Sequence, residues 1–471
     1  MNNEKLYING EYIDSESGQW INVENPTTEE IIARVPRANQ KDVDKAVEAA
    51  SNSLEAWSNL DLEKRIEYVE KYNQWMKDHS EEFLDTFAKE LGSPLGFAKT
   101  SQYRLQIRRT DNFIKQVKNI EFEKELEGGG RLRKEAVGVV AAITPWNYPL
   151  GQIIQKVIPA LLVGCTVVLK PSQKTPLSAY LLVQGFDEVG LPKGVLNLVT
   201  GKGSEIGDML SSHPQVDMVS FTGSTKAGGE VGKRAMEGVK KISLELGGKS
   251  PAIFMESADI KLGVKKVCDS IFLNTGQTCS ALSRAVVLED KKDEIIEEFK
   301  KQAAKYKVGD PFDKNTDIGP LSSEKQFEKV KSYVQSGLEE GAEIVIGKVP
   351  QKTSKGYFVE PIVFDKVKPG MKIHDEEIFG PVLTITSVKD MDEAIEVANS
   401  VKYGLNAAVF GEKEEAIALA RKIKSGSVII NEGKGDIDLP FGGYKMSGLG
   451  REGGSCGLEE FLEEKSLHCG E

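Results

Sequence analysis

The stretch from residue 137 to 223 decides the fold, because short apolar segments alternate in it with segments of helix length. The strand-like segments are VGVVAAI (137–143), TVVLK (166–170), GVLNLVT (194–200) and VDMVSFTG (216–223). Between them lie IIQKVIPALLVG (153–164) and PLSAYLLVQGFDEVG (176–190). This alternation is typical of a parallel sheet with helices packed on it, so the sequence predicts an α/β fold.

A second series of the same kind follows. Its strand-like segments are PAIFM (251–255), AVVLED (285–290), EIVIG (343–347), VLTITSV (382–388), NAAVFG (406–411) and SVIIN (427–431). We therefore expect two α/β units in series, joined near 245–250. Before them, YINGEYI (7–13) predicts a hairpin that turns at Asn9-Gly10, and 40–118 has helical spacing. Alternating runs around Gly128–Gly130 predict a long antiparallel hairpin.

Composition and charge limit the function classes. A chain of 471 residues is expected to hold two or three domains. Its net charge of −11 argues against nucleic acid and anionic membrane surfaces as partners. Five cysteines without a C-x-x-C pair predict neither a disulfide framework nor a zinc site. With no secretory segment and no apolar run of about 18 residues, we expect a cytoplasmic protein without metal or membrane contacts.

Cys279 is a candidate nucleophile. It lies in FLNTGQTCSALSR (272–284), after a glycine-containing turn and before an expected helix whose N-terminus would favour the thiolate. A free cysteine is more often a small buried hydrophobic residue, so position alone does not decide its role. None of the four histidines lies in a comparable glycine-rich setting, which argues against a cysteine–histidine pair of the hydrolase kind.

Three further loops have both a functional and a structural interpretation. Glu245 in SLELGGKSP (243–251) could be a general base or a solvated acid at a strand end. GGKS is no P-loop, because Ser243 stands where that motif needs glycine. Asn147 in TPWNYP (144–149) could donate to an oxyanion or simply form a turn. FTGST (221–225) could bind phosphate at a helix start.

Taken together, the motifs TPWNYP, LKPS, FTGST, ELGGKSP, GQTCSALSR, EEIFGPV and PFGGYKMSGLGRE occur in this order over nearly the whole chain. The set resembles the aldehyde dehydrogenase superfamily, in its NAD(P)-dependent, hydrolytic branch that does not acylate coenzyme A. The resemblance implies a Rossmann-type nucleotide-binding domain (1–119 and 138–246) and an α/β catalytic domain (247–440). It also implies a small bridging hairpin with the tail (120–137 and 441–471) and a homodimer or homotetramer.

The resemblance also implies roles for residues. Cys279 would attack the aldehyde, Asn147 and the Cys279 backbone N–H would hold the oxyanion, and Glu245 would activate the water that hydrolyses the thioester. The expected class is EC 1.2.1.-, specifically 1.2.1.3. The implied cofactor contacts are Ile143, Thr144, Pro145, Trp146, Lys170, Ser172, Gln173, Gly203, Gly207, Phe221, Thr222, Gly223, Ser224, Leu246, Glu377 and Phe379. The implied substrate pocket comprises Tyr148, Gln155, Thr278, Ser280 and Phe441, with the loop EGKGDIDLP (432–440) at its entrance.

One position departs from the family pattern. Gln173 follows Lys-Pro-Ser where the family usually has glutamate, which would accept bonds from the ribose hydroxyls and repel a 2′-phosphate. We therefore expect NAD as cofactor with relaxed discrimination against NADP.

Several alternatives stay open at this point. Within the family they are a semialdehyde dehydrogenase or a betaine-aldehyde-like enzyme. Outside it they are a cysteine acyltransferase or hydrolase without nicotinamide, and a non-enzymatic protein that keeps the fold. Loss of Cys279, Glu245 or Asn147 would be the sign of the last class, and all three are present.

Overall fold

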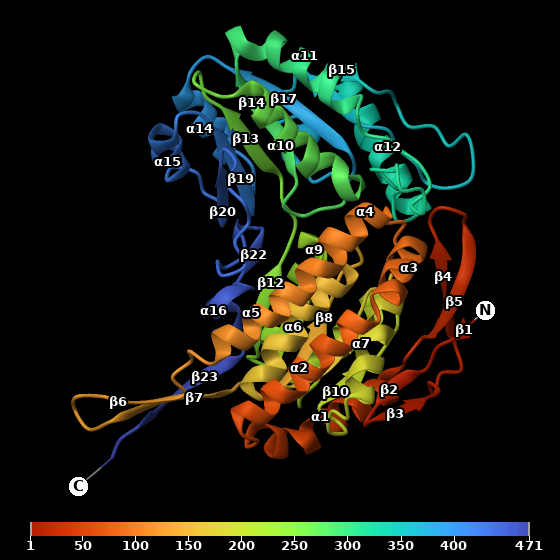
Figure 1. Ribbon diagram of the computed structural model, residues 1–471, viewed down its shortest axis with the longest axis vertical. Helices are drawn as coiled ribbons and strands as arrows, with labels where there is room; N and C mark the ends of the chain where they lie inside the picture. Colours follow the sequence, from red (N-terminus) through yellow and green to blue (C-terminus); the bar gives the residue numbers. More distant parts are fainter. Residues whose placement is uncertain (1, 470–471) are drawn as a thin grey trace.

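Two open, mainly parallel sheets form the two halves of the computed structural model, which describes residues 2–469 (Figure 1). The sheet nearer the N-terminus has the order β22-β12-β11-β8-β9-β10-β2-β3. Its five central strands are parallel, as the β–α alternation predicted. They are β8 (Val139–Ile143), β9 (Thr166–Lys170), β10 (Leu196–Leu198), β11 (Met218–Thr222) and β12 (Lys241–Glu245).

Antiparallel strands close both edges of this sheet. One edge is the predicted hairpin of β2 (Leu6–Ile8) and β3 (Glu11–Ile13), which turns through Asn9 and Gly10 with positive φ. The other edge is β22 (Gly448–Leu449), which pairs with β12 although some 200 residues separate them in sequence. The tail therefore contributes a strand directly beside Glu245, which the sequence did not indicate.

Helices cover both faces of the first sheet. The region expected to be helical from 40 to 118 contains α1 (Gln40–Ser58), α2 (Leu62–Asp78), α3 (Ser80–Glu90), α4 (Leu95–Phe97), the π-helical η1 (Ala98–Arg104) and α5 (Leu105–Val117). The crossover helices are α6 (Pro149–Val163), α7 (Leu177–Glu188), α8 (Gly203–Ser212) and α9 (Thr225–Glu237). Every residue of α6 is buried, because this helix lies between the sheet and the outer helices α2, α5 and α7.

The second sheet has the order β15-β16-β17-β14-β13-β19-β20 and is parallel except at β15. Its strands are β13 (Ser250–Phe254), β14 (Leu282–Leu288), β15 (Glu343–Ile346), β16 (Ile362–Asp365), β17 (Val382–Val388), β19 (Asn406–Phe410) and β20 (Ser427–Ile430). Its helices are α10 (Ile260–Phe272), α11 (Lys292–Ala303), α12 (Glu324–Glu339), α13 (Lys372–Asp375), α14 (Met391–Asn399) and α15 (Lys413–Ala420), with the short η2 (Leu273–Gly276) and η3 (Glu289–Lys291). The chain passes from the first sheet to the second between β12 and β13, within the stretch where the sequence predicted the junction.

A three-stranded sheet projects from the body of the molecule (Figure 1). It consists of the predicted hairpin, β6 (Glu123–Glu125) and β7 (Arg131–Ala136), joined by β23 (Leu462–Leu467) from the tail. The remaining small elements are β1 (Asn2–Asn3), β4 (Trp20–Asn25) and β5 (Glu30–Pro36) in one sheet, β18 (Tyr403–Gly404) with β21 (Tyr444–Lys445), and α16 (Gly454–Glu459). The sheet of β1, β4 and β5 was not predicted. Between residues 2 and 469, no helix combines the length and the apolar character that a membrane crossing requires.

Candidate active site

Four neighbouring parallel strands of the first sheet end at one edge and carry the sequence motifs there. The order β12-β11-β8-β9 places Glu245, Thr222, Ile143 and Lys170 at adjacent strand ends. In open α/β sheets, ligands bind outside the carboxyl ends of the strands. The loops that follow these strands form one wall of a candidate site, and the loop that carries Cys279 belongs to the second sheet.

The Cys279 loop has an unusual backbone. Asn274, Thr275 and Gly276 have φ values of 53°, 56° and 68°, so three successive residues are left-handed. A Cβ on Gly276 would fall 2.1 Å from the carbonyl oxygen of Gly380, so only glycine fits this close approach. This contact fixes the Cys279 loop against the loop that carries Glu377.

The expected helix after Cys279 was wrong. A short turn follows the cysteine and leads directly into β14, so no helix N-terminus acts on the sulfur. Burial raises the pKa of the Cys279 thiol to about 12, and the nearby charges of Glu377 and Glu245 add to the shift. These shifts favour the protonated thiol over the thiolate that the sequence suggested.

Cys279 lies on a cavity of about 150 Å³ between the two sheets. The lining also contains Asn147 and the following predicted cofactor contacts: Pro145, Trp146, Thr222, Gly223, Ser224, Leu246, Glu377 and Phe379. Gln152, Gly247, Gln326 and Lys329 complete the lining. The described residues around this cavity include no histidine, so the cysteine has no imidazole base beside it.

Asn147 is held rigidly beside the cysteine loop. Its backbone carbonyl accepts hydrogen bonds from Gln102 Nε2 and Asn274 Nδ2, both at 3.0 Å. Its own Nδ2 donates to the backbone carbonyl of Gln277 at 2.8 Å. That bond uses one of the two amide hydrogens, and the other can donate to an oxygen in the cavity.

Glu245 is buried at the end of β12, with 2 % of its surface exposed. Within residues 2–469, neither of its carboxylate oxygens has a hydrogen-bond partner. Burial raises its pKa well above the ordinary value, the charge of Glu452 raises it further, and Lys156 and Arg451 oppose the shift. Glu245 does not line the Cys279 cavity itself, but the next residue, Leu246, does.

A buried ion pair lies behind Glu245. Lys156 Nζ in α6 donates to Glu452, and their side chains are 1 % and 4 % exposed. The sequence reasoning missed this pair, although a lone lysine in the apolar run IIQKVIPALLVG was a usable signal. It also missed Gln326 and Lys329, and their amphipathic helix α12 gave no signal that could have found them.

The predicted cofactor contacts offer groups suited to a dinucleotide. Glu377 accepts a hydrogen bond from the Gly248 N–H at 2.9 Å, and the rings of Phe379 and Trp146 meet edge to face at 5.3 Å. Ser224 caps α9, whose N-terminus suits a phosphate.

Some buried polar groups at the same edge of the first sheet lack hydrogen-bond partners among the described residues. The hydroxyl oxygens of Thr144 and Thr222 have no hydrogen-bond partner among the described residues. Burial lowers the pKa of Lys170 to about 8, and its Nζ donates to the Pro171 carbonyl at 3.0 Å. Gly203, at the start of α8, faces this ammonium: a Cβ there would lie 3.9 Å from Nζ. These groups fit a ligand rich in hydroxyls and phosphates.

The other expected contacts surround this edge without lining the Cys279 cavity. Ile143 and Phe221 are buried in β8 and β11, and Gly207 is buried in α8. Ser172 and Gln173 are half-buried directly after β9. The role of these sixteen residues in binding a cofactor stays a prediction.

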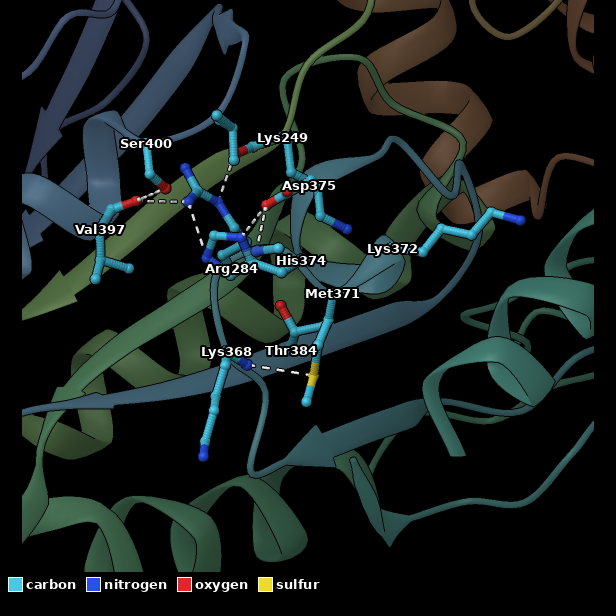
Figure 2. Close-up of polar contacts among 12 residues, drawn as sticks. Lys249, Arg284, Lys368, Met371, Lys372, His374, Asp375, Thr384, Val397 and Ser400 are labelled. Carbon is cyan, nitrogen blue, oxygen red and sulfur yellow. Dashed lines mark hydrogen bonds and ion pairs between the residues drawn. The ribbon is translucent and has the colours of Figure 1, made fainter. Parts of the chain in front are cut away.

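An arginine of the second sheet ties the site segments together (Figure 2). The buried Arg284 in β14 donates to the backbone carbonyls of Lys249 (2.9 Å), Val397 (2.8 Å) and Ala398 (2.9 Å). The Lys249 carbonyl belongs to the segment that follows Glu245. Arg284 therefore joins the strand after Cys279 to the segment after Glu245 and to the end of α14.

A larger cavity of about 470 Å³ lies beside α5. Of the five expected pocket residues, Gln155 and Phe441 line it, together with most of the loop predicted at the entrance. Tyr148, Thr278 and Ser280 do not. The Tyr148 and Thr278 hydroxyls form a hydrogen bond of 2.9 Å, and the Ser280 carbonyl accepts from Asn406. The α5 residues Leu105, Arg109, Asn112 and Phe113 complete one wall, and the sequence did not indicate them.

The geometry defines an α/β protein with a cysteine thiol and an amide donor on one cavity between two sheets. Comparison with known families agrees with this description, since the family model described as Aldehyde dehydrogenase family matches residues 12–467. The chain belongs to the aldehyde dehydrogenase family.

Individual relatives are similar over nearly their full length. Two of them carry only a provisional aldehyde dehydrogenase name without a substrate: a protein from Staphylococcus haemolyticus, 43 % identical, and one from Staphylococcus aureus, 44 % identical. Each match covers 98 % of both chains. Among solved structures, a cysteine-to-alanine mutant of aldehyde dehydrogenase C of Pseudomonas syringae, in complex with NAD⁺ and octanal, has a TM-score of 0.97 and 39 % identity, covering 98 % of this chain and 96 % of that one. The betaine aldehyde dehydrogenase of Staphylococcus aureus, in complex with NAD⁺, has a TM-score of 0.95 and 36 % identity, covering 98 % and 94 %.

Proposed function

We propose that this protein oxidises an aldehyde to a carboxylic acid, with NAD⁺ as the hydride acceptor and a thioester on Cys279 as the intermediate. This activity corresponds to EC 1.2.1.3. The observation that carries the proposal is the shared cavity, which brings Cys279 and Asn147 together with Trp146, Glu377 and Phe379. The NAD⁺ complexes of the two similar structures support the choice of cofactor.

The first step is addition of the Cys279 sulfur to the carbonyl carbon. Because burial raises the pKa of the thiol to about 12, its proton leaves to water as the aldehyde comes into place, and the sulfur attacks as a thiolate. The carbonyl oxygen becomes negative, and the free amide hydrogen of Asn147 and the Cys279 backbone N–H are the donors for it. When bound, the nicotinamide supplies the acceptor for the hydride that leaves the carbon, and a thioester remains on Cys279.

The second step is hydrolysis. Glu245 takes a proton from water, the oxygen attacks the thioester carbon, the carbon–sulfur bond breaks and Cys279 leaves as a thiolate. In sum, one aldehyde, one NAD⁺ and one water give one carboxylate, one NADH and two protons. The raised pKa of Glu245 makes it a stronger base than an exposed glutamate, which suits proton removal from water.

The test is an assay of an aldehyde panel with NAD⁺, following the absorbance of the reduced nicotinamide. We expect turnover by the wild type and none by Cys279→Ala. The matched control is Cys456→Ala, which removes an exposed thiol and should leave the rate unchanged. Turnover that survives in Cys279→Ala would contradict the mechanism, and an absence of reduced nicotinamide with every aldehyde would contradict the function.

A cysteine acyltransferase or hydrolase is the candidate from another class. It would act on esters or thioesters without nicotinamide. That reaction would give no role to Trp146, Glu377 and Phe379, the groups suited to a dinucleotide on the Cys279 cavity, which argues against it.

A further inference from the structure

Arg109 introduces a positive charge into the larger cavity. It lies on α5, one turn before Asn112 and Phe113, and all three residues line the cavity together with Gln155 and Phe441. Arg109 is half-buried, and since it lines the cavity, this space is where its remaining surface can meet a ligand.

The guanidinium of Arg109 has few partners within the protein. Its Nη1 donates to Gln106 Oε1 at 3.0 Å, which is its one side-chain hydrogen bond within residues 2–469. Over the same residues, no carboxylate oxygen lies within the 4.0 Å that defines an ion pair with it. A guanidinium carries five N–H donors and stays charged at any physiological pH. Most of its donors therefore remain free for a ligand.

The rest of the cavity wall does not neutralise this charge. Gln155, Asn112 and Phe441 are uncharged, and the charged residues Lys434 and Asp436 of the entrance loop are exposed to solvent. The nearest buried acid that affects Arg109, Glu452, is already paired with Lys156. The inner wall thus presents a single uncompensated cation.

Arg109 lies close to the reacting centre as well. Phe441, on the wall of the same cavity, precedes Gly442, and a Cβ on Gly442 would lie 2.7 Å from Glu245 Oε1. In agreement with this placement, burial lowers the pKa of Arg109 and the charges of Glu452, Tyr148 and Cys279 oppose that shift. A substrate whose aldehyde carbon reaches Cys279 can therefore extend its other end toward Arg109.

We propose that Arg109 binds a carboxylate at the far end of the aldehyde, so that the preferred substrates are semialdehydes with a terminal carboxylate. This inference rests on the proposed aldehyde oxidation. A guanidinium matches the two oxygens of a carboxylate in a bidentate pair, and one cation balances one such charge. A phosphate would bring nearly two charges, for which the inner wall offers no second cation.

The same charge acts against cationic aldehydes. The similar betaine aldehyde dehydrogenase of Staphylococcus aureus is named for an aldehyde that carries a quaternary ammonium group. In this chain such a group would approach Arg109 and meet a like charge. The substrate choice of that relative is therefore not expected here.

The test compares substrates of equal chain length. We would measure kcat/KM with NAD⁺ for glutarate semialdehyde against pentanal, for succinate semialdehyde against butanal, and for betaine aldehyde. The first variant, Arg109→Gln, removes the charge. The second, Arg109→Lys, keeps a charge but lacks the planar guanidinium that can pair with both carboxylate oxygens. The control is Arg108→Gln. Arg108 is the neighbouring exposed residue of the same helix.

For the wild type we expect a semialdehyde to be preferred over its neutral counterpart and betaine aldehyde to be the poorest substrate. Arg109→Gln should lower kcat/KM for the semialdehyde about 10- to 100-fold while changing that for pentanal little. Arg109→Lys should recover part of the preference, and Arg108→Gln should match the wild type.

Equal rates for semialdehyde and neutral aldehyde in the wild type, or an equal loss on both in Arg109→Gln, would overturn this inference. If the wild type oxidises pentanal but shows no preference, the proposed oxidation stands and the role of Arg109 fails. If no aldehyde reduces NAD⁺, the proposed function itself fails. The pentanal rate of Arg109→Gln also reports whether the variant is folded.

Discussion

The two cavities on either side of the Cys279 region are built in different ways. The cavity that contains Cys279 is formed by loops at the ends of parallel strands, where backbone atoms approach closely. A Cβ on Gly248, for example, would fall 2.3 Å from the Cys279 carbonyl oxygen. The larger cavity is formed by side chains of α5, by Gln155 of α6, by the β20 residues 427–430, by the loop from 433 to 441, and by Gly453 and Gly454.

Because of this difference, we expect the first cavity to carry out the reaction and the second to select the substrate. The close backbone approaches fix the loops of the first cavity, so its groups have little freedom to move. On the α5 wall of the second cavity, Leu105, Arg109, Asn112 and Phe113 present side chains, which can change without moving the backbone. Variants of the first cavity should therefore affect all aldehydes alike, and variants of the second should affect aldehydes differently.

The largest effect is expected from Glu245→Gln. The amide keeps the shape of the side chain but cannot take a proton from water, so kcat should fall about 10²- to 10⁴-fold with every aldehyde. One equivalent of reduced nicotinamide should still form rapidly, and intact-protein mass spectrometry should find an acyl group on Cys279. Glu463→Gln, at an exposed position of β23, is the control. Loss of the rapid phase as well would assign Glu245 to the first step instead.

Asn147→Ala should give the next largest effect. Removal of one oxyanion donor lowers kcat about 10²- to 10³-fold, again for all aldehydes. Asn112→Ala is the matched amide deletion in the second cavity, where Nδ2 donates to the Ile437 carbonyl at 2.9 Å. Its effect should depend on the aldehyde. If the two variants gave the same pattern across a panel, the separation between the cavities would be wrong.

Phe441→Ala should change selectivity by chain length. Apolar contact with a phenylalanine side chain contributes about 1.5–3 kcal/mol, so kcat/KM for pentanal should drop about 10-fold or more. Acetaldehyde is too short to extend far from Cys279 and should react at nearly the wild-type rate. A uniform loss on both aldehydes, measured under the same conditions, would place Phe441 in the reaction rather than in selection.

Gln173→Glu should have a smaller effect, on the cofactor alone. Like charges about 4 Å apart repel by about 1 kcal/mol in water, so the ratio of kcat/KM for NADP to that for NAD should fall about fivefold. The measurement uses one saturating aldehyde and both cofactors. If the ratio does not change, Gln173 does not face the ribose.

Glu460→Gln should produce the smallest change, a shift of the pH profile. The charge of Glu460 raises the pKa of Glu245, so its removal lowers that pKa. A base acts in its deprotonated form, and the rising limb of kcat against pH should therefore move to lower pH while the plateau stays the same. The amide can still accept the hydrogen bond from the Arg451 N–H. An unchanged or upward-shifted limb would mean that another group sets the profile.

The fold was largely predictable from the sequence, because buried parallel strands need continuous apolar runs such as VVAAI and TVVLK. The residues of the first cavity were predictable for a related reason, since glycine pairs and strand ends mark close backbone approaches. The protonation state of the Cys279 thiol was not predictable from the sequence. It depends on burial and on Glu377, which lies about one hundred residues further along the chain.

The second cavity was only partly predictable. Gln155 and Phe441 lie near recognisable motifs, whereas Arg109 lies in a helix whose spacing shows only which face is buried. A half-buried arginine and a surface arginine cannot be told apart by helical spacing alone. Only the packing of α5 against α6 and the loop from 433 to 441 distinguishes Arg109 from Arg108.

Besides the side chain of His374, Arg284 contacts Lys249, Val397 and Ala398, these three only through their main-chain carbonyls. Every amino acid supplies such a carbonyl, so substitutions at 249, 397 and 398 would keep the three hydrogen bonds from Arg284. The arginine itself has no such freedom, because lysine offers one ammonium where the geometry uses a planar fork. In each of these contacts, the residue that supplies the carbonyl can therefore be substituted, whereas Arg284 cannot.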